Sequence, residues 1–324
     1  MTDFLFLTHN NVNPYFNLAS EEYLLKQTSG FYFYLWINEP AVIVGINQNS
    51  IQEVNLSYTD ENNIKVVRRL TGGGAVYHDL GNICYTVIAP YNQSEEHYKK
   101  FTAPIIEYLN SLGVNAKFSG RNDICIEDKK ISGNAQTVYK DRIMHHGTIL
   151  FDTDLSVLAN ALKPNKLKIQ SKGIKSIRAR VTNIINELPN KISTQEFYNG
   201  LCNHFRKSFA EYHLSEKDLQ EINKLKEQKY SQFYWNIGLS PKGSNVFEGK
   251  FSFGVLTINF DIENGLMQNV QIYGDFFSKK PIEEFAQMLN GIKFNKKEVQ
   301  KTMQNIDKYI VNANGQEITD RIFE

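Results

Sequence analysis

Residues Arg68–Asn82 read RRLTGGGAVYHDLGN, which places three consecutive glycines shortly after a pair of arginines. Glycine has no Cβ, so such a loop lets the backbone approach a ligand closely and adopt positive φ at little cost. Successive exposed N–H groups in that backbone can form an anion-binding concavity. On a strand the two arginines point to opposite faces, so one of them faces the same site as the loop. The glycines alone leave a second interpretation open, a hairpin turn with surface arginines.

Two common nucleotide-binding patterns are absent from this stretch. Neither GxxxxGK[ST] nor GxGxxG fits the glycines and the residues around them. Both patterns place phosphates on a strand–loop–helix turn. A nucleotide bound by this loop is therefore held in another geometry.

A second stretch, Arg121–Gln136, reads RNDICIEDKKISGNAQ. Lys129 and Lys130 are adjacent, so on a strand they face opposite ways and one of them points inward beside Ser132. A lysine that faces a site is a mobile point charge suited to a carboxylate or a phosphate. The alternative is a charged turn at a hairpin tip, which the residues alone favour.

The segment from Lys163 to Arg180 holds seven Lys or Arg and no Asp or Glu, although the whole chain has a net charge of only +1. It fits a loop that folds over phosphates, a docking surface for an acidic partner, a nucleic-acid patch or a plain solvated loop. Aromatic residues are missing from the segment, which argues against base stacking.

Several classes of site and location are disfavoured. His145 and His146 are adjacent in an expected strand, so they do not easily share one metal ion, and no GxSxG elbow is present. The three cysteines are far apart without a CxxC spacing, which is typical of a reducing compartment. The first ten residues lack a signal peptide, and the most apolar run, Phe31–Ile37, is too short to span a bilayer. We expect a cytoplasmic protein.

The order of elements predicts an α+β main domain followed by a small α+β domain. A helix is expected at Asn13–Gln27, and two strands flank the turn NEP. Further short strands form a meander, and a helix is expected near Thr194–Tyr212. A solvated helix or linker follows at Tyr212–Glu227. Beyond it, ENG between two alternating runs predicts a hairpin, and two helices end the chain.

Four strings in this order resemble the lipoate–protein ligase A family. They are RRLTGGGAVYHDLGN, GRNDICIEDKKISGNAQ, HHGTIL and KGIKSIRARVTN. NPYFNLASEEYLL resembles the N-terminal helix of the family, and the resemblance covers roughly residues 1–215. It implies a biotin–protein-ligase-like mixed sheet with flanking helices over residues 1–230. Residues 231–324 would then be a small accessory domain.

The resemblance also implies an activity. Family members activate lipoate with ATP and Mg²⁺ to lipoyl-AMP and release pyrophosphate. They then transfer the lipoyl group to a lysine of a lipoyl carrier domain, in a 2-oxoacid dehydrogenase subunit or a glycine-cleavage carrier. Neither nucleic acid nor membrane is an expected partner, and Mg²⁺ would enter with ATP, without a protein cage.

The matching positions assign residues to this chemistry. Lys130 matches the family's catalytic lysine, where a preplaced cation stabilises charge that develops on the carbonyl oxygen and the phosphate. Expected contacts to ATP or lipoyl-AMP are Arg69, Gly73, Gly74, Ala75, Val76, Tyr77, Asn82, Asp123, Lys130, Lys175 and Arg178. Expected neighbours of the lipoyl chain are Val44, His78, Gly133 and His146, with Val76 and Tyr77 as further candidates.

The chain departs from the family pattern at one place. Some members have Ser-Gly-Ser-Ala-Tyr-Arg where residues 132–137 read SGNAQT, so one charge contact is in doubt. A transferase of the same fold that moves an acyl group without ATP is the near alternative, because Cys84 and Cys125 lie in or near the motifs. A non-catalytic polyanion-binding module is the distant one.

Overall fold

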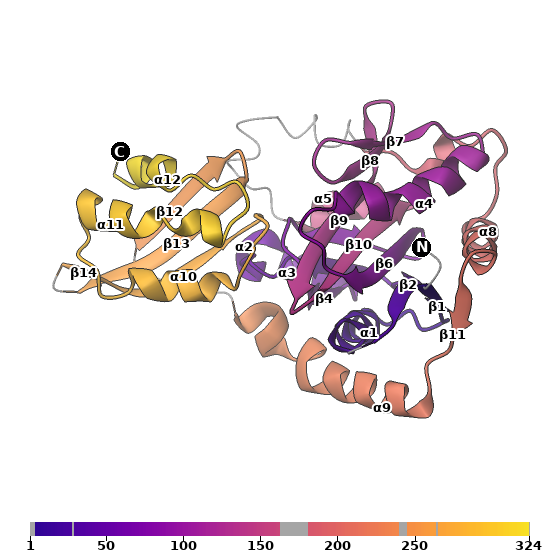
Figure 1. The fold of residues 1–324 in the computed structure, drawn as a ribbon, viewed down its shortest axis with the longest axis horizontal. Helices are drawn as coiled ribbons and strands as arrows, with labels where there is room; N and C mark the ends of the chain where they lie inside the picture. The colour runs from indigo at the N-terminus through magenta and orange to yellow at the C-terminus, as the bar shows by residue number, and fades with distance from the viewer. Residues whose placement is uncertain (1–3, 28, 163–180, 240–244, 264, 324) are drawn as a thin grey trace.

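The computed structural model describes residues 4–27, 29–162, 181–239, 245–263 and 265–323. The chain forms a large α+β body and a smaller α+β body made by its last quarter (Figure 1). The predicted fold class, a mixed-sheet domain with flanking helices and a small C-terminal α+β domain, is confirmed. Among the described residues, no helix is long and apolar enough to cross a membrane.

An eight-stranded mixed sheet is the centre of the large body, in the order β11-β1-β2-β6-β10-β9-β8-β7. Its strands are β1 (Phe4–Thr8), β2 (Phe31–Ile37), β6 (Asn82–Pro90), β7 (Ala116–Ser119), β8 (Asp123–Ile126), β9 (Lys129–Tyr139), β10 (Arg142–Leu150) and β11 (Ala210–Tyr212). Strand β1 pairs in parallel with β2 and β11, and the remaining neighbours are antiparallel. The predicted meander is β8–β9–β10.

Both faces of this sheet are buried. In β2, Phe33 and Leu35 enter the core under α4 (His97–Ser111) and α8 (Thr194–Arg206), whereas Tyr34 and Trp36 enter the core under α1 (Pro14–Lys26). This alternation follows from the two-residue period of a strand. The expected helix through Tyr212 is too long, because α8 ends at Arg206 and β11 instead pairs with the free edge of β1.

A second, three-stranded sheet carries the glycine loop. Its order is β4-β3-β5, with β3 (Ala41–Val44), β4 (Lys65–Arg68) and β5 (Val76–His78). The strands on the two sides of the NEP turn therefore belong to different sheets. Short helices α2 (Ser50–Glu53), α3 (Leu56–Glu61) and α5 (Leu155–Ala161) lie near this sheet. The glycines connect β4 to β5.

The segment between the two bodies contains the expected helix, which is exposed along most of its length but packs one side against the large body. Helix α9 (Glu216–Leu225) and the π-helical turn η2 (Lys226–Tyr230) lie against α1. Tyr230 is fully buried and donates to Glu22 at 2.6 Å. A second π-helical turn, η3 (Tyr234–Gly238), contacts β4, and the Arg68 guanidinium donates to the carbonyl oxygen of Trp235 at 3.0 Å. Buried hydrogen bonds thus fix this connection to the large body.

The small body is a three-stranded antiparallel sheet with helices packed on it. The predicted hairpin is confirmed in β13 (Gly254–Glu263) and β14 (Leu266–Gly274), and β12 (Asn245–Phe251) completes the sheet. The two expected helices are α10 (Ile282–Leu289) and α11 (Lys296–Met303), and α12 (Gly315–Ile322) is a third that was not predicted. Their apolar faces and the sheet share one core.

Candidate active site

Arg69 holds the glycine loop from within. Its buried guanidinium donates to the carbonyl oxygens of Ile43 at 3.0 Å, Gly72 at 2.6 Å and Gly74 at 2.9 Å. Gly73 has a φ of +91°, a conformation that side chains with a Cβ rarely adopt. Arg69 lines the cavity beneath the loop, as the alternation of the two arginines predicts for one of them. Arg69 also supports the backbone of the glycine loop through these hydrogen bonds. This second role was not predicted from the sequence.

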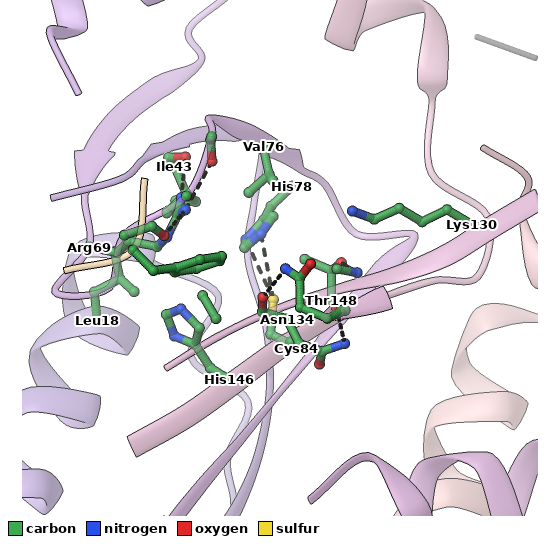
Figure 2. A pocket seen from close by; sticks show the side chains of 18 of the residues that line it. Leu18, Ile43, Arg69, Val76, His78, Cys84, Lys130, Asn134, His146 and Thr148 are labelled. Carbon is green, nitrogen blue, oxygen red and sulfur yellow. Dashed lines mark hydrogen bonds between the residues drawn. The ribbon is translucent and has the colours of Figure 1, made fainter. Parts of the chain in front are cut away.

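The cavity beneath the loop has a volume of about 110 Å³ and is called here the smaller cavity. Residues from α1, both sheets and the glycine loop line it, and Phe277 from the small body completes one wall. Figure 2 shows Lys130 reaching in from one side, with Arg69 and Leu18 on the other and His78, Cys84 and Asn134 between them. Its lining is Leu18, Trp36, Ile43, Arg69, Gly72, Gly73, Gly74, Val76, His78, Cys84, Asn122, Lys130, Gly133, Asn134, Ala135, His146, Gly147, Thr148 and Phe277.

A larger cavity, of about 970 Å³, adjoins the smaller one. Four residues line both: Val76, Lys130, Gly133 and Thr148. Of the other expected site residues, Ala75, Tyr77 and Asp123 line the larger cavity only. Two compartments of different size therefore meet beside one lysine.

The Lys130 side chain forms an ion pair with Asp123, and its ammonium group lies close to the backbone of Gly133. Its Nζ lies 2.8 Å from Oδ1 of Asp123. A Cβ added at Gly133 would lie only 2.7 Å from that Nζ, so a glycine there leaves room for the lysine. Nζ of Lys129 lies 3.6 Å from Oε1 of Glu187. The prediction that the two lysines face fully opposite ways is wrong in part, because Lys129 also lines the larger cavity.

The physical reason is an irregularity in the strand pair that carries these lysines. The register between β8 and β9 shifts between Ile124 and Cys125, directly beside the pairing of Cys125 with Lys130. Such a shift twists the strand and redirects side chains locally.

Two expected site residues lie outside the cavities. Val44 is fully buried with Val42 and Val54 on the other face of β3, and its neighbour Ile43 lines the smaller cavity instead. Asn82 is fully buried in β6, where its Nδ2 lies 3.2 Å from Sγ of Cys84. The two-residue period of a strand explains the place of Val44, because it sends the neighbours Ile43 and Val44 to opposite faces of β3. Asn82 lies on the same face of β6 as Cys84, but it packs behind that residue and lines neither cavity. Lys175 and Arg178 lie outside the described residues.

Two titratable side chains at the floor of the smaller cavity, those of His78 and Cys84, are neutral near pH 7. Burial lowers the pKa of His78 to about 3, and the positive charge of Arg69 acts in the same direction. Burial raises the pKa of the Cys84 thiol well above its ordinary value, and the charge of Glu21 adds to this effect. The ring nitrogen Nδ1 of His78 lies 3.1 Å from Nδ2 of Asn38. This floor suits an uncharged part of a ligand.

The two adjacent histidines of β10 have separate surroundings. His146 contacts Oγ1 of Thr71 through Nε2 at 2.7 Å, whereas His145 contacts Gln136 through Nδ1 at 2.9 Å. Within the described ranges, no group of three or more His, Cys, Asp or Glu is placed to hold a metal ion.

Some lining residues were not predicted as site residues. Trp36 and Ile43 come from strands that read as plain core, and strand alternation alone does not say which face meets a cavity. Phe277 comes from the small body, more than 200 positions along the chain from the glycine loop, and no sequence signal links the two. Asn134 lines the cavity at the position where the chain departs from the family pattern.

Comparisons with known proteins identify the family of the chain. The model of the lipoyl protein ligase A/B catalytic domain matches residues 13–206, and that of the bacterial lipoate protein ligase C-terminus matches residues 240–322. Lipoate-protein ligase LplJ of Bacillus subtilis is 40% identical over 98% of this chain and its own full length. Lipoate–protein ligase 1 of Staphylococcus aureus is 42% identical over 94% of each chain.

Solved structures of ligases have the same fold. LipL1 of P. falciparum, in complex with lipoate, has a TM-score of 0.79 at 29% identity and covers 98% of this chain and 97% of its own. A bipartite lipoate protein ligase of Thermoplasma acidophilum, described with its E2 lipoyl domain, has a TM-score of 0.65 at 30% identity. That comparison covers 76% of this chain and all of the other. A lipoate-protein ligase A bound with ATP has a TM-score of 0.62 at 28% identity, over 73% of this chain and 98% of its own.

The catalytic and C-terminal models together account for both bodies of the structure, and the similarity to the two bacterial ligases extends over nearly the whole chain. The chain therefore belongs to the lipoate–protein ligase A family and is a lipoate–protein ligase.

Proposed function

We propose that the smaller cavity holds the lipoyl chain, that the larger cavity holds ATP, and that Lys130 acts where they meet. The observation that carries this assignment is the set of four residues that line both cavities, Lys130 among them. A reaction between a carboxylate and a nucleotide needs the two substrates held in contact and in the correct orientation. The smaller cavity, with its neutral floor, suits an aliphatic chain, and the larger one suits a nucleotide.

In the first step, a carboxylate oxygen of lipoate attacks the α-phosphorus of ATP. A new P–O bond forms, the bond to the bridging oxygen breaks, and pyrophosphate leaves with the electron pair. The Lys130 ammonium at the junction attracts both the carboxylate and the phosphate, and it stabilises the charge of the transition state. The glycine loop, with its backbone supported by Arg69, lies close to the developing acyl-adenylate and can donate to it through N–H groups other than that of Gly73, which donates to the carbonyl oxygen of Phe276.

In the second step, the amine of a carrier lysine attacks the lipoyl carbonyl carbon. An amide bond forms, the C–O bond to AMP breaks, the amine loses a proton, and AMP departs as the leaving group. Negative charge moves from the carbonyl oxygen to the AMP phosphate, and both lie within reach of one cation at the junction. One lysine thereby serves both steps.

The larger cavity also suits the magnesium ion that accompanies ATP. Phosphate oxygens of ATP would supply most of its ligands, because the acidic residues that line this cavity, Asp123, Glu127 and Asp128, are not grouped to hold a metal ion by themselves and Asp123 is paired with Lys130. The ATP-bound structure of a lipoate-protein ligase A and the lipoate complex of LipL1 support the choice of substrates. Lys175 and Arg178 remain predicted contacts to the adenylate.

A lipoyl carrier domain is the proposed protein substrate. The archaeal ligase described with its E2 lipoyl domain supports this choice. A cytoplasmic location remains a prediction, and the three cysteines, all free and buried, agree with it. We propose residues 1–230 as the catalytic part and 231–324 as the accessory part. The contacts of Trp235 with Arg68 favour a boundary a few residues later.

The alternative of an ATP-independent acyl transferase receives little support from the thiols. A cysteine nucleophile reacts as the thiolate. Burial raises the pKa of both Cys84 and Cys125, so both thiols stay protonated near pH 7.

The test is to mix the protein with lipoate, ATP and Mg²⁺ in the absence of any carrier. We expect pyrophosphate release and a protein-bound lipoyl-AMP, followed by lipoylation when a lipoyl domain is added. Transfer from an acylated carrier without ATP, and no pyrophosphate, would support the transferase instead.

A further inference from the structure

The carboxylate of Glu21 is buried in α1 behind the smaller cavity, and only 1% of the residue is exposed. Its Oε1 accepts a hydrogen bond from Oγ1 of Thr86 at 2.5 Å and lies 2.9 Å from Nδ1 of His146. A buried carboxylate is costly unless neighbouring groups satisfy its oxygens. Through these two neighbours Glu21 is connected with two groups that line the cavity, the His146 ring and the Trp36 indole.

The first path leads to the glycine loop. Nε2 of His146 lies 2.7 Å from Oγ1 of Thr71, and that oxygen accepts from Nε of Arg69 at 2.9 Å. Arg69 in turn donates to the carbonyl oxygens of Gly72 and Gly74. Three hydrogen bonds therefore connect the buried carboxylate with the guanidinium that holds the loop.

This path has a consistent direction. With the Nδ1 proton of His146 donated to Glu21, Nε2 can accept from the Thr71 hydroxyl, whose oxygen accepts from Nε of Arg69. Burial lowers the pKa of Arg69 to about 10, and the charge of Glu21 acts in the opposite direction, so the two ends of the path interact electrostatically.

The second path of hydrogen bonds leads from Glu21 through Thr86 to Trp36. Oγ1 of Thr86 donates to Glu21 and accepts from Nε1 of Trp36 at 2.9 Å. Trp36 is 1% exposed and lines the smaller cavity, as His146 does. One carboxylate therefore connects through hydrogen bonds with both an indole and an imidazole that line the cavity.

We propose that Glu21 is a positioning residue for lipoate: it fixes the tautomer of His146 and, through Thr71 and Arg69, the shape of the glycine loop. This inference rests on the proposed use of the smaller cavity for the lipoyl chain. Glu21 itself does not line the cavity, so its effect is transmitted through its hydrogen-bonded neighbours. Buried networks of this kind hold a site in one arrangement when every member is satisfied.

The adjacent Glu22 provides a matched control. It is 2% exposed on the same helix, and it binds Lys26 at 2.6 Å, Lys229 at 2.7 Å and Tyr230 at 2.6 Å, away from the cavity. Glu21→Gln and Glu22→Gln each remove one buried charge while keeping the shape of the side chain. Only the first change alters the hydrogen bonds behind the cavity.

The measurement is lipoate affinity in the absence of ATP, together with the KM for ATP in pyrophosphate release. We expect Glu21→Gln to weaken lipoate binding about tenfold to hundredfold, the usual cost of losing a charged buried hydrogen bond. The KM for ATP should stay within about twofold. Glu22→Gln should leave both within about twofold, although it lowers the melting temperature. Equal lipoate affinity in the two variants would overturn the proposal.

Two further measurements separate positioning from general destabilisation. Thr71→Val breaks the same path, so the double variant with Glu21→Gln should be much less impaired than the product of the two single effects. Nitrogen-15 spectra of His146 should show the proton on Nδ1 in the wild type and a changed tautomer population in Glu21→Gln. Independent effects, or a wild-type proton on Nε2, would contradict the proposal.

These outcomes are distinct from failure of the proposed function. If the wild-type protein binds no lipoate, the assignment of the cavity itself is wrong. If the wild type binds lipoate and Glu21→Gln binds it equally well, only the role of Glu21 is wrong. Thr71→Val, with its small change of shape, keeps the test available if Glu21→Gln does not fold.

Discussion

Lys130 and Lys129 are neighbours in β9, yet only Lys130 lines both cavities. We therefore expect Lys130→Met to lower both lipoyl-AMP formation and transfer by about 10²–10³, because in the proposed mechanism one preplaced charge stabilises both transition states. Lys129→Met is the matched control and should retain most activity, since its Nζ lies near Glu187 at the larger cavity only. Single-turnover rates of each step provide the measurement. A more severe loss in Lys129→Met would reverse the assignment.

His78 gives the free energy of unfolding a pH dependence with a definite sign. Its pKa is about 3 in the folded protein, against 6.5 for an unperturbed histidine. Between those values the unfolded chain binds a proton that the folded chain does not, so stability falls as the pH falls. From about pH 7 to pH 5 this residue alone should remove about 2 kcal/mol.

The variant His78→Gln isolates this contribution. Urea unfolding of wild type and variant at both pH values should show a smaller loss of stability in the variant, because its side chain does not titrate there. Other buried histidines, such as His145, titrate in both proteins and cancel in the difference. An equal loss in the two proteins would show that His78 is not held neutral by the fold.

At the scale of elements, the glycine loop depends on backbone conformation and on close approach. Gly73 has a φ of +91°, and a Cβ there would lie 3.1 Å from Nη2 of Arg69. Gly73→Val should cost about 1–3 kcal/mol of stability through backbone strain, and it should also weaken lipoate binding. Gly291→Val is the control, with a φ of +81° and no atom within 4 Å of its Cβ position.

Comparison of the two variants separates strain from function. Calorimetry should show similar stability losses, whereas titration with lipoate should show weaker binding in Gly73→Val only. Unchanged binding in a folded Gly73→Val protein would mean that the loop is a simple turn.

The elements differ in how far the sequence could predict them. The meander β8–β10 and the hairpin β13–β14 were predictable because alternating residues and turn signals are local. The last part of the helix expected to end at Tyr212 is strand β11, because its pairing with β1 is a long-range contact that local propensity does not contain. The π-helical turns after α9 pack on α1 for the same kind of reason.

The residues of the site also differ in how far the sequence could predict them. The resemblance of their strings to the family assigned the glycine loop and Lys130 to the site, whereas the residues alone left a simple turn open for the glycines and favoured a charged hairpin tip for Lys130. Val44 was placed in the site and Ile43 was not, since the face of β3 that meets the cavity depends on the neighbouring sheet. Glu21 read as one of two acidic residues on an ordinary helix, and only its buried contacts distinguish it from Glu22.

At the scale of the whole molecule, the small body touches the glycine loop directly. The backbone N–H of Gly73 donates to the carbonyl oxygen of Phe276 at 3.3 Å, and Nδ2 of Asn47 donates to Ser278 at 3.2 Å. The Phe277 ring lines the smaller cavity, and the Arg121 guanidinium lies 4.4 Å from its centroid. Residues 276–278 therefore form part of the site as well as a contact between the two bodies.

This arrangement predicts that Phe277→Ala weakens lipoate binding although the residue lies in the accessory part. Removing the ring opens one wall of the smaller cavity and takes apolar contact from the lipoyl chain, so we expect a loss of roughly tenfold in affinity. Phe233→Ala is the control, because Phe233 is also aromatic but is 70% exposed beside the π-helical turn η3. Titration with lipoate and with ATP separately provides the measurement, and ATP affinity should change little in either variant. If Phe277→Ala binds lipoate as tightly as Phe233→Ala does, the small body contributes contact between the two bodies but no wall of the lipoate site.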